Sequence, residues 1–428
     1  MKFFKSKNGT KWTWATMLFT GAISFGVLSC DDDSNDVDST VVEVESGWLV
    51  GFRNDTPQGR VYYIGVYEGI PSETDPSNAV EIGLNARIFS FGESPYTWNG
   101  NAATMTKWAV NREDLSISVA GIVSFAGAGF SGDLTPPLLL SEERAFITKL
   151  TEGVIVEWNP TTMKITQTYI VDPLPTPGAG VNFHGENGKY ITPSGKILMP
   201  IYYANSEPCC ELTNVNPSTV AVFDPVTGTI QYNQDDRLFA HFGGFNIDEN
   251  GTQYLFPTSN NSIVDAYFNI DEPTRESLYN VLKVDAEGNY DPNFELDLSE
   301  VVPISALGNS FFIQNNKLVF TYVDDSFTWP ESYEDRFSSL FSADFVTVAL
   351  DLTTFEVTKF SVLDDYFYVN SGWGNVIDNK NYFVTGTFDF NTSIETSFIV
   401  RQDGLENFTV LSTHVGGTFQ AVNRLWGN

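Results

Sequence analysis

A short pattern recurs along this chain and predicts β-hairpins. In its clearest copy, residues 221–230, alternating apolar residues lead into Asp224-Pro225, and Gly228 precedes a second apolar run. Asp-Pro and Gly favour tight turns, and alternation with period two is typical of strands. Related hairpins are predicted at 156–165 and 348–357, with weaker copies after Trp108, Lys283 and Ile399 and a degenerate copy at Val61 to Gly69.

The spacing of these hairpins indicates a repeat architecture. The period is roughly 50 to 65 residues, which is typical of a propeller blade with variable loops. A second set of strand pairs lies between the hairpins, which gives four strands per blade. The copies of this second set begin near Ala86, Leu138, Lys189, Gly244, Phe311, Asn375 and Thr418. We therefore predict an all-β propeller of about seven four-stranded blades, with six or eight as alternatives.

The two ends of the predicted propeller contain strand-like segments that could share one blade. Trp48 to Phe52 forms one such segment, and Thr418 to Leu425 forms the other. If they pair, the ring closes and no unpaired sheet edge remains between the first and last blades. We expect this pairing.

The first 29 residues have the composition of an export signal. They carry four lysines and no acidic residue, followed by a mostly apolar run from Ala15 to Leu28. This run is too short for a stable membrane span and is typical of a secretory signal peptide. It ends in Val27-Leu28-Ser29-Cys30, which resembles the lipobox of bacterial lipoproteins. The resemblance implies lipidation at Cys30, with membrane attachment through the lipid alone.

Acidic residues follow the cysteine directly. The run Asp31-Asp32-Asp33-Ser34-Asn35-Asp36-Val37-Asp38 has little apolar surface to bury, so residues 30–46 are predicted to form a disordered tether before a propeller at 47–428. A run of acids at this position resembles the export tag of surface lipoproteins in one Gram-negative phylum. The resemblance implies an outer-membrane protein that faces the medium.

The charge of the chain restricts its partners. The formal net charge is −31, and removal of the four leader lysines takes it to about −35. Such a field repels nucleic acid and anionic membrane surfaces. Since salt confines surface fields to roughly 8 Å, a local basic pocket for an anion remains possible. With 42% hydrophobic and 14% aromatic residues, the chain can form a large core.

The long connections of the predicted blades share one face, where binding sites usually lie. They include residues 204–218, 258–280 and 323–344. The three histidines, His184, His241 and His414, fall in connections between blades on the same face. They could point toward the axis as ligands or donors, or pack the blade starts with backbone partners.

The other candidate binding residues are a cysteine pair, several aromatic residues and a few cations. The adjacent pair Cys209 and Cys210 could form a vicinal disulfide, as exported proteins favour oxidation, although the ring is strained and two free thiols are the alternative. Aromatic residues could form a ligand surface or pack the loops together. The candidates are Tyr202, Trp329 and Trp373, with Arg237 and the further cations Arg53, Arg87 and Lys107. The turn Asp285-x-Glu287-Gly288-Asn289 is interpreted as a hairpin turn rather than a calcium loop.

Taken together, the lipobox, acidic tether and aromatic-rich propeller resemble surface lipoproteins of the xenosiderophore-utilisation type, which accompany TonB-dependent receptors. The similarity covers Cys30 to Asn428 in organisation, and no strict motif transfers binding residues by position. The resemblance implies capture of a ferric siderophore and its transfer to an outer-membrane transporter. No cofactor is implied beyond an iron chelate bound as the ligand.

Three functions are consistent with the sequence. The leading hypothesis is a non-catalytic binding protein for a small molecule, with no metal site and no catalytic residue assigned. An extracellular enzyme acting on a glycan or small metabolite is the second, because paired carboxylates such as Asp324-Asp325 neither establish nor exclude it. A scaffold that binds protein through the loop face is the third.

Overall fold

The computed structural model describes residues 43–57, 59–83, 86–130, 137–175, 183–186, 190–204, 217–237, 245–248, 251–256, 279–314, 316–332, 339, 345–360, 368–378, 380–389, 392–403 and 407–427. The chain divides into two units, Met1–Val42 and Glu43–Asn428. The predicted leader, the lipidation site Cys30 and most of the tether lie outside the described residues. No helix in the described ranges is long and apolar enough to cross a bilayer.

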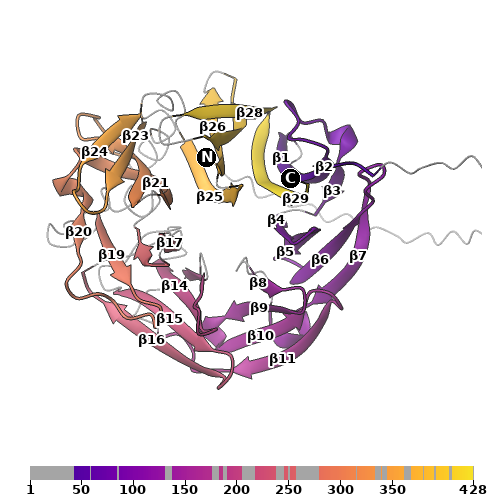
Figure 1. Cartoon of the computed structure of the whole chain (residues 1–428), viewed down its shortest axis with the longest axis horizontal. Helices are drawn as coiled ribbons and strands as arrows, with labels where there is room; N and C mark the ends of the chain where they lie inside the picture. Colours follow the sequence, from indigo (N-terminus) through magenta and orange to yellow (C-terminus); the bar gives the residue numbers. More distant parts are fainter. Residues whose placement is uncertain are drawn as a thin grey trace, which may run out of the picture. The chain divides into compact units, whose positions relative to one another are not determined.

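Unit Glu43–Asn428 is a seven-bladed β-propeller, as predicted (Figure 1). From the axis outward, blade 1 contains β29 (Gly417–Trp426), β1 (Gly47–Thr56), β2 (Gly59–Tyr67) and β3 (Val80–Ile82). Blade 2 contains β4 (Ala86–Phe91), β5 (Ser94–Asn99), β6 (Thr104–Val110) and β7 (Ile117–Ser124), and blade 3 contains β8 (Leu138–Ser141), β9 (Arg144–Lys149), β10 (Val154–Asn159) and β11 (Lys164–Ile170).

The next four blades repeat this arrangement. Blade 4 contains β12 (Phe183–Glu186) and β13 (Tyr190–Ile191), which both pair with β14 (Ile197–Ala204), then β15 (Ser218–Asp224) and β16 (Thr229–Asp235). Blade 5 contains β17 (Phe245–Ile247), β18 (Gln253–Leu255), β19 (Asn280–Val284) and β20 (Leu296–Asp297). Blade 6 contains β21 (Ile304–Gln314), β22 (Lys317–Asp324), β23 (Phe345–Asp351) and β24 (Val357–Phe360), and blade 7 contains β25 (Tyr368–Ile377), β26 (Lys380–Asp389), β27 (Ile394–Gln402) and β28 (Phe408–Val415).

Four short 3-10 helices lie in the connections of the described residues. They are η1 (Pro76–Asn78), η2 (Ala126–Ala128), η3 (Leu150–Glu152) and η4 (Leu298–Glu300).

The recurring hairpin of the sequence is the pair of outer strands in a blade. In its clearest copy, the amide of Gly228 donates to the carbonyl oxygen of Asp224 at 2.8 Å, and the Asp224 carboxylate accepts from the amide of Val226. Gly228 has a φ of +71°, which glycine adopts without a steric penalty. One detail of the prediction is wrong: Val61 to Gly69 holds no hairpin turn, because Gly59–Tyr67 is one continuous strand.

The predicted ring closure is confirmed. Strand β29 from the C-terminus pairs antiparallel with β1 from the N-terminus, in a register that places Trp48 opposite Arg424 and Val50 opposite Val422. Blade 1 therefore contains strands from both ends of unit Glu43–Asn428. This pairing satisfies the backbone groups that an open ring would leave exposed.

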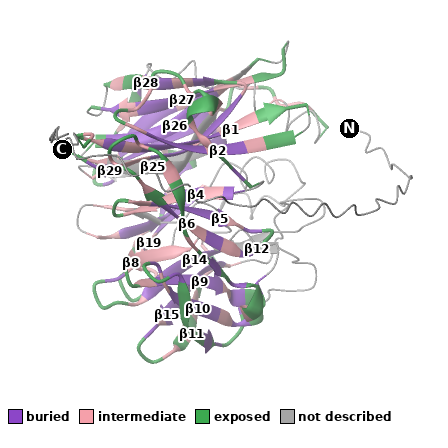
Figure 2. Ribbon diagram, turned by 90° about the vertical axis from the view of Figure 1, so that its right-hand side faces the viewer, coloured by how far each residue is buried: buried purple, intermediate pink, exposed green. Residues whose placement is uncertain are grey.

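The core consists of apolar clusters between successive blades, visible as buried strand surfaces in Figure 2. Between blades 2 and 3, Trp98 and Trp158 are almost fully buried, and the ring centroid of Phe125 lies 5.8 Å from that of Trp158. Since each blade buries its faces only against its neighbours, the blades form a rigid support for their turns and loops.

Candidate functional site

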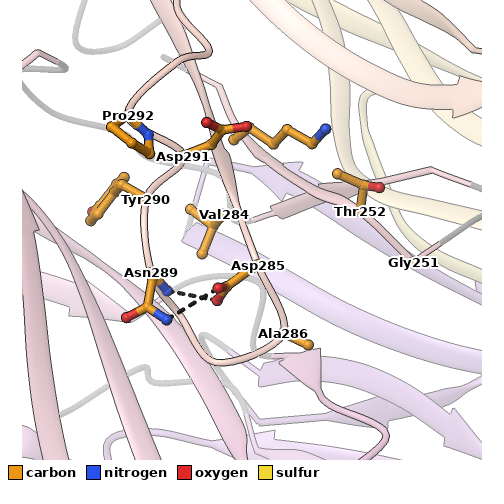
Figure 3. A pocket seen from close by; sticks show the side chains of 10 residues that line it. Gly251, Thr252, Val284, Asp285, Ala286, Asn289, Tyr290, Asp291 and Pro292 are labelled. Carbon is orange, nitrogen blue, oxygen red and sulfur yellow. Dashed lines mark hydrogen bonds between the residues drawn. The ribbon is translucent and has the colours of Figure 1, made fainter.

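A pocket among the described residues lies in blade 5 and has a volume of about 580 Å³ (Figure 3). It is formed by the turn between β17 and β18 and by the connection from β19 to β20. Because strand direction alternates across a blade, these two turns share one face of the propeller. The lining residues are Gly251, Thr252, Lys283, Val284, Asp285, Ala286, Asn289, Tyr290, Asp291 and Pro292.

The wall of this pocket begins with a tight turn after β19. The Asp285 carboxylate accepts hydrogen bonds from the amides of Glu287 at 2.8 Å and Asn289 at 2.9 Å, and from Asn289 Nδ2 at 3.1 Å. Figure 3 shows the side chains of Asp285 and Asn289 directed toward each other. The carboxylate therefore holds its own turn, as the hairpin interpretation of this motif predicts.

Blade 4 fixes the position of the turn. Asn233 donates to the carbonyl oxygen of Gly288 at 2.8 Å, and Lys196 forms an ion pair with Glu287. Gly288 has a φ of +81°, and a β-carbon there would lie 2.4 Å from Val222 Cγ2. Only glycine meets both requirements, so the turn packs closely against the neighbouring blade. Sequence pattern could not reveal this contact, because it joins two blades.

Lys283 supplies the positive charge of the pocket. Its ammonium lies 5.9 Å from the centroid of the Phe294 ring. No ion pair joins Lys283 to a carboxylate within the part of the chain that the structure describes. In a chain with 54 acidic and 23 basic residues, a lysine without a carboxylate partner at a pocket is a candidate contact for a ligand.

Other polar groups line the same pocket. Thr252 comes from the β17–β18 turn, and Asp291 and Tyr290 come from the β19–β20 connection. The hydroxyl of Tyr290 lies 2.9 Å from Ser218 Oγ in blade 4. The pocket thus combines hydrogen-bond donors, acceptors and an aromatic ring, a combination that can position a polar small molecule.

Arg237, a predicted ligand residue, is positioned behind this pocket. Its guanidinium pairs with Asp235 at 2.8 Å and donates to the carbonyl oxygens of Asp291 and Phe294, both at 3.0 Å. Hydrogen bonding to Asp235 raises the pKa of Arg237. Burial acts to raise the pKa of Asp235, but the hydrogen bonds from Arg237 outweigh it and the net shift is downward. The arginine supports the pocket wall through these contacts.

His414 lies at the end of β28 and is 4% exposed. Its Nε2 lies 2.9 Å from the carbonyl oxygen of Arg53, and its Nδ1 lies 2.6 Å from Thr74 Oγ1. Its ring packs between Phe52 and Phe419. Burial lowers the pKa of His414, and the hydrogen bond to the carbonyl oxygen of Arg53 offsets part of this shift. Both ring nitrogens have partners inside the protein.

Trp329 is partly buried against Phe327, with ring centroids 4.7 Å apart, and its Nε1 donates to Ser305 Oγ at 3.1 Å. For three of the other predicted ligand residues, the structure describes the backbone alone. His184, Tyr202 and Trp373 lie in β12, β14 and β25, and their side chains lie outside the described part of the chain. His241, Cys209 and Cys210 also lie outside it.

The further candidate cations do not gather at one place. Arg53 bridges Asp55 and Glu395. Arg87 lies on β4 in blade 2. Lys107 lies 5.8 Å from the Tyr96 ring and lines a second pocket of about 250 Å³ between blades 1 and 2, together with Arg112 and Trp426.

The long connections predicted to hold the site lie largely outside the described residues, at 205–216, 257–278 and 333–344 apart from Ser339. The pocket at Lys283 lies on the opposite face, where no binding site was predicted. Among the described residues, no group of three or more His, Cys, Asp or Glu side chains could hold a metal ion.

No protein-family model matches the chain, and no curated protein matches its sequence. Among solved structures, the chain is similar to a protein of Bacteroides fragilis that is proposed to be a 6-phosphogluconolactonase. The two sequences are 11% identical, and the TM-score is 0.50. The match covers 92% of this chain and 99% of that one. It is also similar to the periplasmic gluconolactonase PpgL of Pseudomonas aeruginosa, with 9% identity, coverage of 89% and 100%, and a TM-score of 0.48. The similarity to the Bacteroides fragilis structure supports the propeller fold and does not show an activity for this chain.

Proposed function

We propose that this chain is a non-catalytic binding protein that captures a ferric siderophore at the bacterial cell surface and passes it to a TonB-dependent outer-membrane receptor. Cys30 carries the lipid anchor, and residues 30–46 form the tether. The seven-bladed fold is consistent with this function, and the resemblance of the N-terminal residues supports the location.

The observation that carries the proposal is the environment of Lys283. A siderophore complex is a compact chelate with oxygen acceptors around the iron and apolar or aromatic edges. The Lys283 ammonium can donate to those oxygens, and Tyr290 offers a ring and a hydroxyl at the same pocket. The volume of about 580 Å³ falls in the usual range for small-molecule sites.

The acidic residues of the pocket affect which chelate binds. The Asp285 carboxylate is occupied by its own turn, and Asp291 accepts from the amide of Asn293 at 2.9 Å. Both carboxylates line the same pocket as Lys283. We therefore expect chelates of low negative charge to bind more tightly than highly anionic ones, because like charges repel over these short distances.

Titration of the purified full-length protein with ferric siderophores of both hydroxamate and catecholate types tests this function. Quenching of the protein's tryptophan fluorescence reports binding, and oligosaccharides serve as controls. We expect saturable quenching by one siderophore class at micromolar concentration or tighter, without chemical change of the ligand. No saturable response to any ferric siderophore would overturn the proposal.

The alternative of an enzyme is tested in the same samples. The solved structure from Bacteroides fragilis is proposed to be a lactonase, and the likeness at 11% identity concerns the fold alone. Incubation with a sugar lactone, followed by measurement of acid release above the spontaneous rate, separates the two functions. Turnover without siderophore binding would favour an extracellular enzyme.

A further inference from the structure

The turn between the two outer strands of a blade contains a residue with a left-handed backbone. In blades 4 and 5 this residue is Gly228 and Gly288, and glycine adopts the conformation without a steric penalty. In blade 6 the position holds Phe355, with a φ of +59°. The amide of Phe355 donates to the carbonyl oxygen of Asp351 at 2.8 Å, the same distance as in the Gly228 turn. The backbone of Phe355 is therefore strained, because its β-carbon crowds a carbonyl oxygen.

The equivalent residues of blades 2 and 3 are also strained, but they are packed into the core. They are Leu115, with a φ of +59°, and Met163, with a φ of +52°. Met163 is 8% exposed in the cluster between blades 2 and 3, and Leu115 packs against the cluster between blades 1 and 2. Phe355, in contrast, is 43% exposed. Burial offsets less of its strain, and strained residues are concentrated at functional sites.

The turn residue of a blade lies against the outer strands of the preceding blade. A β-carbon on Gly288 would lie 2.4 Å from Val222 Cγ2 in blade 4, and one on Gly228 would lie 3.3 Å from Tyr169 Cδ1 in blade 3. Met163 of blade 3 likewise packs in the cluster shared with blade 2. The turn residue of blade 6 is therefore directed toward the outer strands of blade 5.

The residue of blade 5 that corresponds to Val222 is Lys283. Val222 precedes Asp224, the first turn residue of blade 4, by two positions. Lys283 precedes Asp285, the first turn residue of blade 5, by the same number. The side chain of Lys283 lies on the side that faces blade 6, because its ammonium is near the Phe294 ring, which packs against the cluster between blades 5 and 6. The repeat geometry thus directs the turn residue of blade 6 toward Lys283.

We propose that Phe355 is a specificity-determining residue of the Lys283 pocket. Its ring closes over a flat aromatic ring of the ligand, and the Lys283 ammonium binds an anionic oxygen on that ring. The placement of the ligand at Lys283 rests on the proposed function. Phe355 is not one of the residues that line the pocket, so its ring turns toward Lys283 as the ligand binds. Such stacking favours flat rings over puckered ones.

Benzoate and cyclohexanecarboxylate are suitable probes, because they carry the same carboxylate on a flat and a puckered ring. Saturation-transfer NMR with the full-length protein gives a dissociation constant for each. We expect benzoate to bind in the millimolar range and at least about fivefold more tightly than cyclohexanecarboxylate. Lys283→Met should weaken both probes, whereas Phe355→Gly should remove the preference for benzoate.

The matched control is Met163→Gly, which changes the equivalent residue of blade 3. Phe355→Gly relieves backbone strain at a half-exposed position, so its melting temperature should equal or exceed that of the parent protein. Met163→Gly removes a buried side chain and should lower the melting temperature, with the preference for benzoate retained. The two variants thus separate a ring that contacts ligand from one that packs the fold.

Three outcomes would overturn the proposal. The first is no saturable binding of benzoate by the parent protein. The second is an unchanged preference for benzoate in Phe355→Gly. The third is a melting temperature that falls as far in Phe355→Gly as in Met163→Gly, which would show that the ring packs the fold. Benzoate binding at Lys283 without binding of any ferric siderophore would contradict the proposed function alone.

Discussion

The Nε2 nitrogen of His414 donates a hydrogen bond to the carbonyl oxygen of Arg53, with 2.9 Å between the two atoms. A carbonyl oxygen can only accept, so Nε2 carries the proton and Nδ1 accepts from Thr74 Oγ1. The neutral histidine thus joins β28 of the last blade to β1 and to the β2–β3 connection of the first. This contact lies beside the strand pairing that closes the ring.

Acidification should weaken this closure. Burial lowers the pKa of His414 in the folded chain, whereas an unfolded histidine titrates near about 6.5. Below that pH the unfolded chain binds the extra proton first, so the free energy of unfolding falls as pH drops from about 6.5 toward the folded-state pKa. Arg53 and Asp55 are the charged groups nearby and act in opposite directions.

Urea unfolding at about pH 7.5 and 5.5 measures this effect, with His414→Gln as the reference that lacks the titrating group. We expect the loss of stability on acidification to be smaller in the variant than in the parent protein. An identical loss in both would show that carboxylates elsewhere account for the pH dependence.

The strand pairing at ring closure should make a large contribution to stability. Phe419 on β29 is fully buried between blades 7 and 1. We expect Phe419→Ala to reduce the free energy of unfolding by about 3 to 5 kcal/mol, because it leaves a cavity in the closing blade. Phe355→Ala, at a 43% exposed position in the β23–β24 turn, is the control and should cost much less. Similar losses in chemical denaturation would contradict the role given to β29.

We expect Arg237 to contribute to the stability of the fold rather than to contact the ligand directly. Arg237→Met removes hydrogen bonds to Asp235 and to two carbonyl oxygens of the pocket wall. We expect a loss of about 2 kcal/mol in the free energy of unfolding, since hydrogen bonds to charged groups contribute about 1.5 to 3 kcal/mol. Lys164→Met, at an exposed position on β11, should change stability by less than about 0.5 kcal/mol. A stable Arg237→Met variant that binds no ligand would instead make Arg237 a direct ligand contact.

Gly288 should be more sensitive to substitution than Gly251, although both have a left-handed backbone. Their φ values are +81° and +79°. Alanine at either position pays the left-handed penalty of about 1 to 2 kcal/mol. The β-carbon of an alanine at 288 would also lie 2.4 Å from Val222 Cγ2, which is too close. The β-carbon of an alanine at 251 would lie 3.7 Å from Tyr190 Oη, an ordinary contact distance. Thermal unfolding should show Gly288→Ala to be the less stable by at least about 1 kcal/mol, and equal stability would contradict the close packing of blades 4 and 5.

Local sequence pattern predicted the elements that depend on neighbouring residues. The turn at Asp224 and Gly228 uses residues four positions apart, so its chemistry is visible in the sequence. The pairing of Trp48–Phe52 with the C-terminal strand was predictable because a repeat protein of this kind must cover its first and last edges. Val61 to Gly69 misled the prediction because its glycines lie in or beside a strand and form no turn.

The site could not be predicted to the same extent, because it depends on contacts between blades. Nothing near Lys283 in the sequence shows that Phe294 lies below its ammonium or that Asn233 of blade 4 holds the turn at Gly288. Arg237 was predicted to contact the ligand, yet it pairs with Asp235, two residues away at the end of β16. Residue type alone did not distinguish a ligand contact from a structural ion pair.

The most direct test of ligand capture at the blade 5 pocket is a comparison of Lys283→Met with Lys164→Met. Isothermal titration with the ferric siderophore that binds the parent protein most tightly gives a dissociation constant for each variant. We expect Lys283→Met to weaken binding by at least tenfold, with unchanged stability, and Lys164→Met to bind like the parent. Parent-like affinity in both variants would show that the siderophore does not use the pocket at Lys283.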